Sequence, residues 1–190
     1  MRKTRQRRRL IFTLVLGVGV AAAAIVSQVG LGGDKRVQIG NGRVSALTSA
    51  ARVTDALPAE VLSYPFASHN FANVRGLGSR LLKTDGSLRL YAVPGKAGMV
   101  CLVEIDDLAR TSGGACADRQ VLMTSSIFIA DRKEDGSQQV AGLVGDGHTY
   151  AEANGTRKAV ENNVFVLRGV ADEEVTIGSP TAEQTVELGD

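Results

Sequence analysis

The sequence predicts a mainly β domain, an antiparallel sandwich or partial barrel with a short N-terminal helical region, preceded by one transmembrane helix. Three observations support this fold class: an uncharged apolar run near the N-terminus, apolar residues at every second position from residue 86 onward, and turn-forming residues between these alternating segments. The expected organisation is a basic cytoplasmic tail, a transmembrane helix, a stalk, an extracytoplasmic β-rich domain and an acidic C-terminal tail, at residues 1–9, 10–33, 34–57, 58–170 and 171–190.

The first 33 residues predict an uncleaved signal-anchor that crosses the membrane once. Six basic residues and no acidic residue stand in the first nine positions, and no charged residue then follows until Asp34. At about 1.5 Å per residue, a helix over residues 10–33 is long enough to cross a hydrocarbon core of about 30 Å. The basic cluster favours a cytoplasmic N-terminus and a domain outside the cell. A cleaved signal peptide is the alternative, but this apolar run is longer than usual and no clear A-x-A cleavage site follows it.

The net charge of +2 conceals an uneven distribution. Removing the six N-terminal basic residues from the total of 22 leaves 16 lysines and arginines against 20 acidic residues, so the rest of the chain is net acidic. A nucleic-acid-binding protein carries its positive charge on the folded domain, so no nucleic-acid partner is expected. The expected partners are the membrane and an envelope protein or polymer.

The segment between the membrane and the sheet is expected to be a stalk that turns helical towards its end, the alternative being a flexible linker throughout. Pro58 then suits the first turn of a short helix. This helical pattern stops at Tyr64-Pro65.

Period-two alternation and turn residues predict the strands. The first hairpin turns at Pro94–Gly98, the second at Asp135-Gly136 and the third at Asn154-Gly155, where Asn-Gly is the strongest short-range hairpin signal in the chain. These pairs are expected at residues 87–105, 125–144 and 148–161, followed by a last strand at 164–168.

The two cysteines, Cys101 and Cys116, are expected to form a structural disulfide. Thiols outside the membrane are oxidised, and two cysteines in one exported domain usually pair. A catalytic dithiol more often has the C-x-x-C spacing, whereas Cys116 follows Cys101 after a polar loop containing glycines.

No catalytic, cofactor-binding or metal-ligating residue is expected. The chain has no P-loop, G-x-G-x-x-G or G-x-S-x-G motif, and its two histidines, His69 and His148, lack further ligands at zinc-site spacing. The function predicted is therefore that of a non-enzymatic binding or structural protein of the cell envelope. The alternatives are an enzyme acting on envelope polymers, with a site in the loops of the β domain, and a signalling protein that needs a partner helix in the bilayer.

Five short segments carry a resemblance to other sequences: residues 89–95, 98–102, 115–117, 140–147 and 161–165. In these segments the chain resembles a group of uncharacterised membrane-anchored extracytoplasmic proteins of high-GC Gram-positive bacteria, over roughly residues 57–168. The turn at Gly145 departs from that group, which commonly has proline there. The group has no established activity, so the resemblance implies a two-cysteine, β-rich, extracytoplasmic domain and adds no mechanism.

Overall fold

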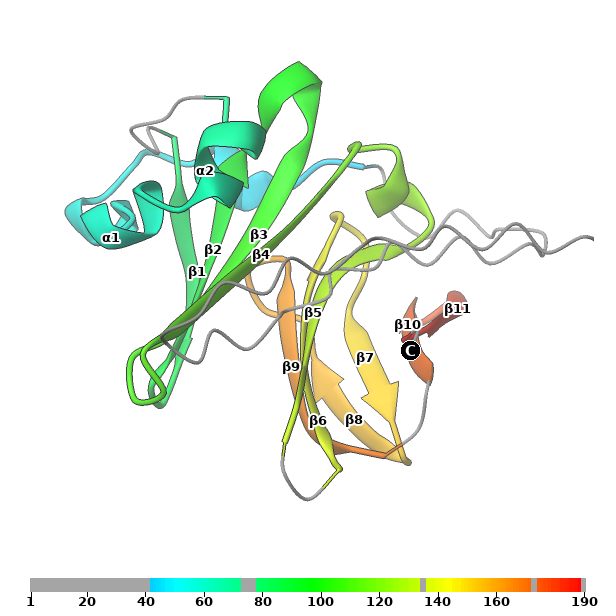
Figure 1. Cartoon of the computed structure of the whole chain (residues 1–190). Helices are drawn as coiled ribbons and strands as arrows, with labels where there is room; N and C mark the ends of the chain where they lie inside the picture. Colours follow the sequence, from blue (N-terminus) through cyan, green and yellow to red (C-terminus); the bar gives the residue numbers. More distant parts are fainter. Residues whose placement is uncertain (1–41, 73–77, 134–135, 172–173, 189–190) are drawn as a thin grey trace, which may run out of the picture.

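The chain folds into antiparallel β-sheets with two short α-helices (Figure 1). The computed structural model describes residues 42–72, 78–133, 136–171 and 174–188. The helices are α1 (Ala59–Leu62) and α2 (Pro65–Asn70), with 3-10 turns at Ser45–Thr48, Val53–Asp55, Lys96–Gly98 and Val121–Met123. The strands are β1 (Arg80–Asp85), β2 (Leu88–Pro94), β3 (Val100–Asp106), β4 (Thr111–Ala117), β5 (Ser126–Arg132), β6 (Gln138–Val144), β7 (Tyr150–Ala153), β8 (Thr156–Ala159), β9 (Val164–Val170), β10 (Glu174–Ser179) and β11 (Ala182–Glu187).

The strands form three sheets, which we call the first, the central and the third sheet. The first sheet has the order β1-β2-β3-β4, the central sheet β5-β6-β9, and the third sheet β11-β10-β7-β8. One apolar cluster joins the first sheet to one face of the central sheet, and a second joins the other face of the central sheet to the third sheet. Because the central sheet is covered on both faces, every residue of β6 is buried, and its sequence does not alternate between polar and apolar residues.

The outer face of the first sheet is covered by α1 and α2 (Figure 1). Val61 of α1 and Ala67 of α2 belong to the same buried cluster as Tyr91 and Val103 of the sheet. Pro58 precedes α1 as its N-cap, which agrees with the expected helix start, and Pro65 occupies the first turn of α2. The expected short helical region is therefore confirmed, but Pro65 begins a second helix where the sequence pattern predicted an end.

The described part of the expected stalk packs against the domain. Val44 and Leu57 are buried, and the carboxylate of Asp146 accepts hydrogen bonds from the backbone N–H of Ser45 (3.0 Å) and from Asn163 Nδ2 (2.8 Å). Residues 42–57 therefore belong to the folded domain. The transmembrane helix expected at residues 10–33 lies outside the described residues, and within the described part no helix is long and apolar enough to cross a bilayer.

The segment expected as an acidic C-terminal tail forms the hairpin of β10 and β11 instead. Val175 and Ile177 of β10 and Val186 of β11 are buried in the cluster between the third and central sheets. The acidic residues Glu183 and Glu187 alternate with these positions and point outward. The acidic residues of the segment mask an apolar residue at every second position of β10, which is the pattern of a half-buried strand.

All three expected hairpins are present, as β2–β3, β5–β6 and β7–β8. At the tip of β7–β8, Asn154 and Gly155 have φ values of 50° and 69°, as a type I′ turn requires. The polar loop expected before Cys116 is strand β4 instead. Position 114 of this strand is a glycine because a Cβ there would overlap the ring of Phe66 from α2. The glycine therefore allows α2 to pack closely against the sheet.

Candidate binding cavity at the edge of the central sheet

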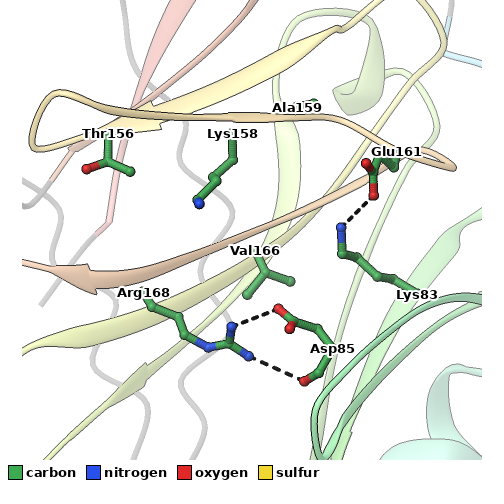
Figure 2. Close-up of a pocket in the computed structure, with 8 residues that line it drawn as sticks. All are labelled: Lys83, Asp85, Thr156, Lys158, Ala159, Glu161, Val166 and Arg168. Atoms are coloured by element: carbon green, nitrogen blue, oxygen red, sulfur yellow. Dashed lines mark hydrogen bonds and ion pairs between the residues drawn. The ribbon is translucent and has the colours of Figure 1, made fainter.

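Each outer sheet has four strands, whereas the central sheet has three. One edge of the central sheet, β9, lies near the edge strand β1 of the first sheet and the edge strand β8 of the third sheet. An open cavity of about 460 Å³ is formed there (Figure 2), a size typical of small-ligand sites. It is lined by Lys83, Asp85, Thr156, Lys158, Ala159, Glu161, Val166 and Arg168.

The strand register explains why polar side chains from both outer sheets reach the cavity. On β8, Thr156 and Lys158 pair across the strand with Ala153 and Ala151, which belong to the core between the third and central sheets. Cross-strand partners share a face of the sheet, so Thr156 and Lys158 lie on the inner face of the third sheet. They lie at its edge strand and remain exposed.

The same argument applies to β1. Lys83 and Asp85 pair with Leu90 and Leu88, which belong to the core between the first and central sheets. Both charged side chains therefore lie on the inner face of the first sheet. The cavity is thus bounded by the inner faces of the two outer sheets, and its floor is the edge strand β9.

Four of the five charged residues that line the cavity form two ion pairs. Lys83 Nζ lies 2.7 Å from Glu161 Oε2, and Arg168 Nη1 lies 2.8 Å from Asp85 Oδ2. The bond from Lys83 lowers the pKa of the Glu161 carboxyl. These pairs join β1 to β9 and to the turn before β9, so their role includes holding the first sheet against the central one.

Lys158 is the fifth charged residue, and its side chain points into the cavity (Figure 2). Among the described residues it makes neither an ion pair nor a hydrogen bond. Three cations and two carboxylates line the cavity, which leaves one positive charge uncompensated on a domain whose sequence is otherwise net acidic. An ammonium group held in a cavity without a partner is suited to an anionic ligand group.

A polar chain leads from the cavity into the space between the first and central sheets. Arg168 Nε donates to Gln139 Oε1 (3.3 Å), and Gln139 Nε2 donates to Glu104 Oε1 (3.3 Å). Glu104 is 6% exposed, and its Oε2 has no partner within the described part of the chain. Burial raises the pKa of Glu104 to about 7, with a further increase from the nearby charge of Asp131. Glu104 does not line the cavity itself.

A second cavity, of about 320 Å³, lies between the N-terminal segment and β1. Its charged residues serve the fold. The carboxylate of Asp55 accepts hydrogen bonds from the backbone N–H groups of Arg52 (2.7 Å) and Leu81 (3.2 Å), and Arg80 Nη2 donates to the carbonyl of Ser49 (2.6 Å). Because these groups fasten the N-terminal segment to β1, this cavity is the weaker candidate for a ligand site.

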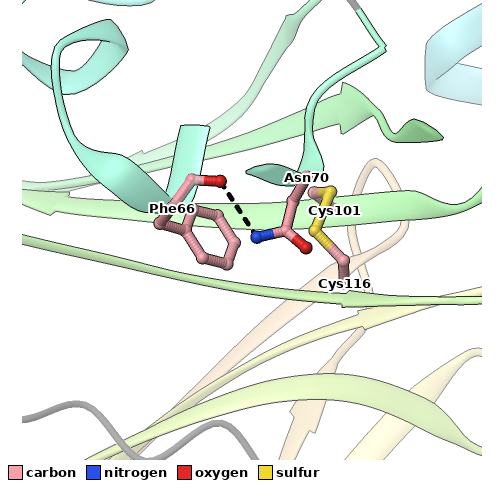
Figure 3. The surroundings of a disulfide bond; sticks show 4 residues. All are labelled: Phe66, Asn70, Cys101 and Cys116. Carbon is pink, nitrogen blue, oxygen red and sulfur yellow. Dashed lines mark hydrogen bonds between the residues drawn. A yellow bond between two sulfur atoms is a disulfide. The ribbon is translucent and has the colours of Figure 1, made fainter. Parts of the chain in front are cut away.

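The predicted disulfide between Cys101 and Cys116 is confirmed (Figure 3). The two cysteines are directly opposite each other on β3 and β4 and lie beneath α2, near Phe66 and Asn70. This is the face of the first sheet that points away from the cavity. The disulfide therefore fastens the outer edge of the first sheet and takes no part in the candidate site.

The two histidines lie apart from each other and from the cavity. His69 Nδ1 lies 2.7 Å from the carbonyl of Pro65 in α2, and His148 Nδ1 lies 3.0 Å from the carbonyl of Gly145. Burial lowers the pKa of His148. Across the described ranges, no three His, Cys, Asp or Glu side chains are grouped so that they could hold a metal ion.

Sequence reasoning did not find the residues of the cavity. One signal was present at Arg168, which continues the inward-facing series of Val164 and Val166 on β9 and so places a charge where an apolar residue is expected. Lys83 and Lys158 gave no such signal, because each lies on an edge strand where exposed charge is usual.

No known protein-family model, curated protein or solved structure matches this chain.

Proposed function

We propose that the chain is a non-enzymatic binding module of the cell envelope, held at the membrane by its N-terminal segment, with its ligand in the cavity between β1, β8 and β9. The observation that carries the proposal is the uncompensated ammonium of Lys158. It points into a cavity whose other charges are already paired. Such a group is available to a ligand without breaking a contact that holds the fold together.

The placement of the carboxyl groups favours binding over catalysis. A general acid or base must come within hydrogen-bond reach of the reacting group. Glu104 has the raised pKa that such a role would use, but it is buried between two sheets and does not line the cavity. The acids that do line the cavity, Asp85 and Glu161, are engaged by Arg168 and Lys83.

Two features support a location outside the cytoplasm. The structure contains a disulfide, and disulfides form and persist mainly in oxidising environments outside the cytoplasm. The basic N-terminus followed by a long apolar run is typical of an anchor with its N-terminus in the cytoplasm. Protease added to intact cells should therefore degrade the domain while an N-terminal tag stays protected. Recovery of a soluble mature protein that begins near residue 33 would refute the anchor.

The cavity itself is tested by position-specific photo-crosslinking in the cells that produce the protein. A photoreactive amino acid is placed either at Thr156, which lines the cavity, or at Thr185, which is also exposed but lies on the opposite edge of the third sheet. The proposal predicts a specific adduct from position 156 and none from position 185. Adducts of equal yield from both positions, or from 185 alone, would refute the cavity as the ligand site.

A further inference from the structure

Strand β9 is an edge of the central sheet, and this edge borders the cavity. The first and third sheets each have one strand more than the central sheet, and residues of their edge strands β1 and β8 line the cavity together with β9. A strand laid beside β9 would lie between residues Lys83 and Asp85 on one side and Thr156 and Lys158 on the other. It would be the fourth strand of the central sheet.

The main chain of β9 offers hydrogen-bonding groups to such a strand. In an antiparallel ladder, successive residues direct their N–H and C=O groups alternately towards and away from the partner strand. The carbonyl of Asn163 accepts from Val144 N–H of β6 (2.9 Å), so Val164 and Val166 direct their groups away from β6. The N–H and C=O of Val164 form hydrogen bonds with the C=O and N–H of Glu161. The N–H and C=O of Val166 are therefore left at the free edge, inside the cavity that Val166 lines.

The charge of the cavity selects one type of side chain on the added strand. Alternate side chains of a strand point to opposite faces, so one set would face β8 and the other would face β1. The set that faces β8 meets Lys158 and the hydroxyl of Thr156. A carboxylate at the central position of that set would compensate the charge of Lys158 by a charge-assisted hydrogen bond.

We propose that the cavity binds an extended peptide segment with an acidic side chain. Its main chain pairs with the edge of β9 at Val166, and its carboxylate bonds to Lys158. This mode is the addition of a strand to an exposed sheet edge, in which main-chain hydrogen bonds supply affinity and side-chain contacts supply specificity. The inference rests on the proposed function and narrows its ligand to an acidic segment of another protein.

The test uses the full-length chain purified in a mild detergent and the pentapeptide Thr-Val-Glu-Val-Thr-amide, which carries a fluorescent dye on its N-terminal amine. Binding is measured by fluorescence anisotropy, with a second peptide that has Gln in place of Glu. The acidic peptide should bind about tenfold more tightly, the factor expected for one charge-assisted hydrogen bond. Lys158→Gln should abolish this preference and Lys158→Arg should retain it. Arg132→Gln, which removes an exposed cation on the opposite edge strand β5, is the matched control and should retain the preference.

Main-chain pairing is tested on the peptide, which leaves the protein unchanged. Methylation of both valine amides removes the donors along one edge of the peptide, and methylation of the glutamate amide removes a donor on the other edge. Because only one edge of an added strand faces β9, one of these peptides should lose binding and the other should keep it. Equal binding of both methylated peptides, or no binding of the unmodified acidic peptide, overturns the inference.

A tetra-galacturonate probe, which has carboxylates but no amide main chain, separates this inference from the proposed function. If it binds and Lys158→Gln abolishes its binding while the peptide does not bind, the acidic-peptide inference is overturned and the cavity remains the ligand site. Failure of the crosslinking at Thr156, by contrast, refutes the proposed function itself.

Discussion

Replacement of the buried Glu104 by glutamine should change how the stability of the domain depends on pH. The burial of Glu104 between the first and central sheets raises its pKa from 4.5 to about 7, and the charge of Asp131 adds to the increase. The folded protein therefore holds a proton that the unfolded chain releases between these two pH values. Because the folded state binds more protons in this range, the stability contributed by the protonated carboxyl is fully present below pH 4.5 and is lost as the pH rises towards 7.

The size of this loss follows from the two pKa values. Their difference of 7 − 4.5 pH units, at about 1.4 kcal/mol per unit, corresponds to about 3 kcal/mol. Glu104→Gln keeps the shape and the acceptor for Gln139 but cannot ionise. The free energy of unfolding of the variant, relative to the unmodified protein, should therefore increase by up to about 3 kcal/mol between pH 4.5 and pH 8.

The measurement is denaturant unfolding of the full-length chain in detergent at several pH values from 4.5 to 8. Glu161→Gln is the matched control because Lys83 lowers the pKa of that carboxyl. The contribution of Glu161 is lost only as the pH falls below 4.5, so Glu161→Gln should leave the pH dependence between pH 4.5 and pH 8 nearly unchanged. A constant difference in unfolding free energy between Glu104→Gln and the unmodified protein across the range would refute the reasoning.

Three further predictions concern stability. Gly142→Ala should destabilise the fold by about 1–3 kcal/mol in denaturant unfolding, because the new methyl group would overlap the ring of Phe165 directly opposite on β9; unchanged stability would contradict this packing. Gly155→Val should lower the melting temperature, since Gly155 has a φ of 69° that a β-branched residue adopts only with strain; a silent substitution would argue against the type I′ turn. Reduction of the disulfide, whose cysteines are 15 residues apart, should lower the unfolding free energy by about 3 kcal/mol, and both thiols should be found blocked by non-reducing peptide mapping of the exported protein.

The sequence predicts those strands in which polar and apolar residues alternate and turn residues stand at the ends. The β7–β8 hairpin followed from Asn154-Gly155, because few residues other than these two accept positive φ at both turn positions. Strand β4 was missed because Gly114 has no side chain, and the reason for the glycine, the ring of Phe66 above it, lies in a distant segment. The β10–β11 hairpin was not predicted because the segment is rich in acidic residues, which is typical of an exposed tail. Its buried valines are too few to make the alternation evident.

The cavity could not be predicted from the sequence because it depends on how many strands each sheet contains. No local pattern shows that β9 is an edge strand or that β8 extends beyond it. Lys158 and Lys83 line the same cavity only because two different sheets place them on facing surfaces. The disulfide, in contrast, was predictable because a single pair of cysteines without the C-x-x-C spacing leaves few alternatives to a structural bridge.

The short central sheet also bears on the solubility of the domain. A free strand edge can pair with the edge of another copy and start aggregation, and natural proteins commonly prevent this with charged side chains that point inward at the edge. The β9 edge is flanked by four such charged side chains, those of Lys83, Asp85, Lys158 and Arg168. A neighbouring copy that offered an apolar strand would have to bury these charges, and it would leave Lys158 without a partner. The residues that would admit an acidic peptide therefore also oppose edge-to-edge pairing between copies of the domain.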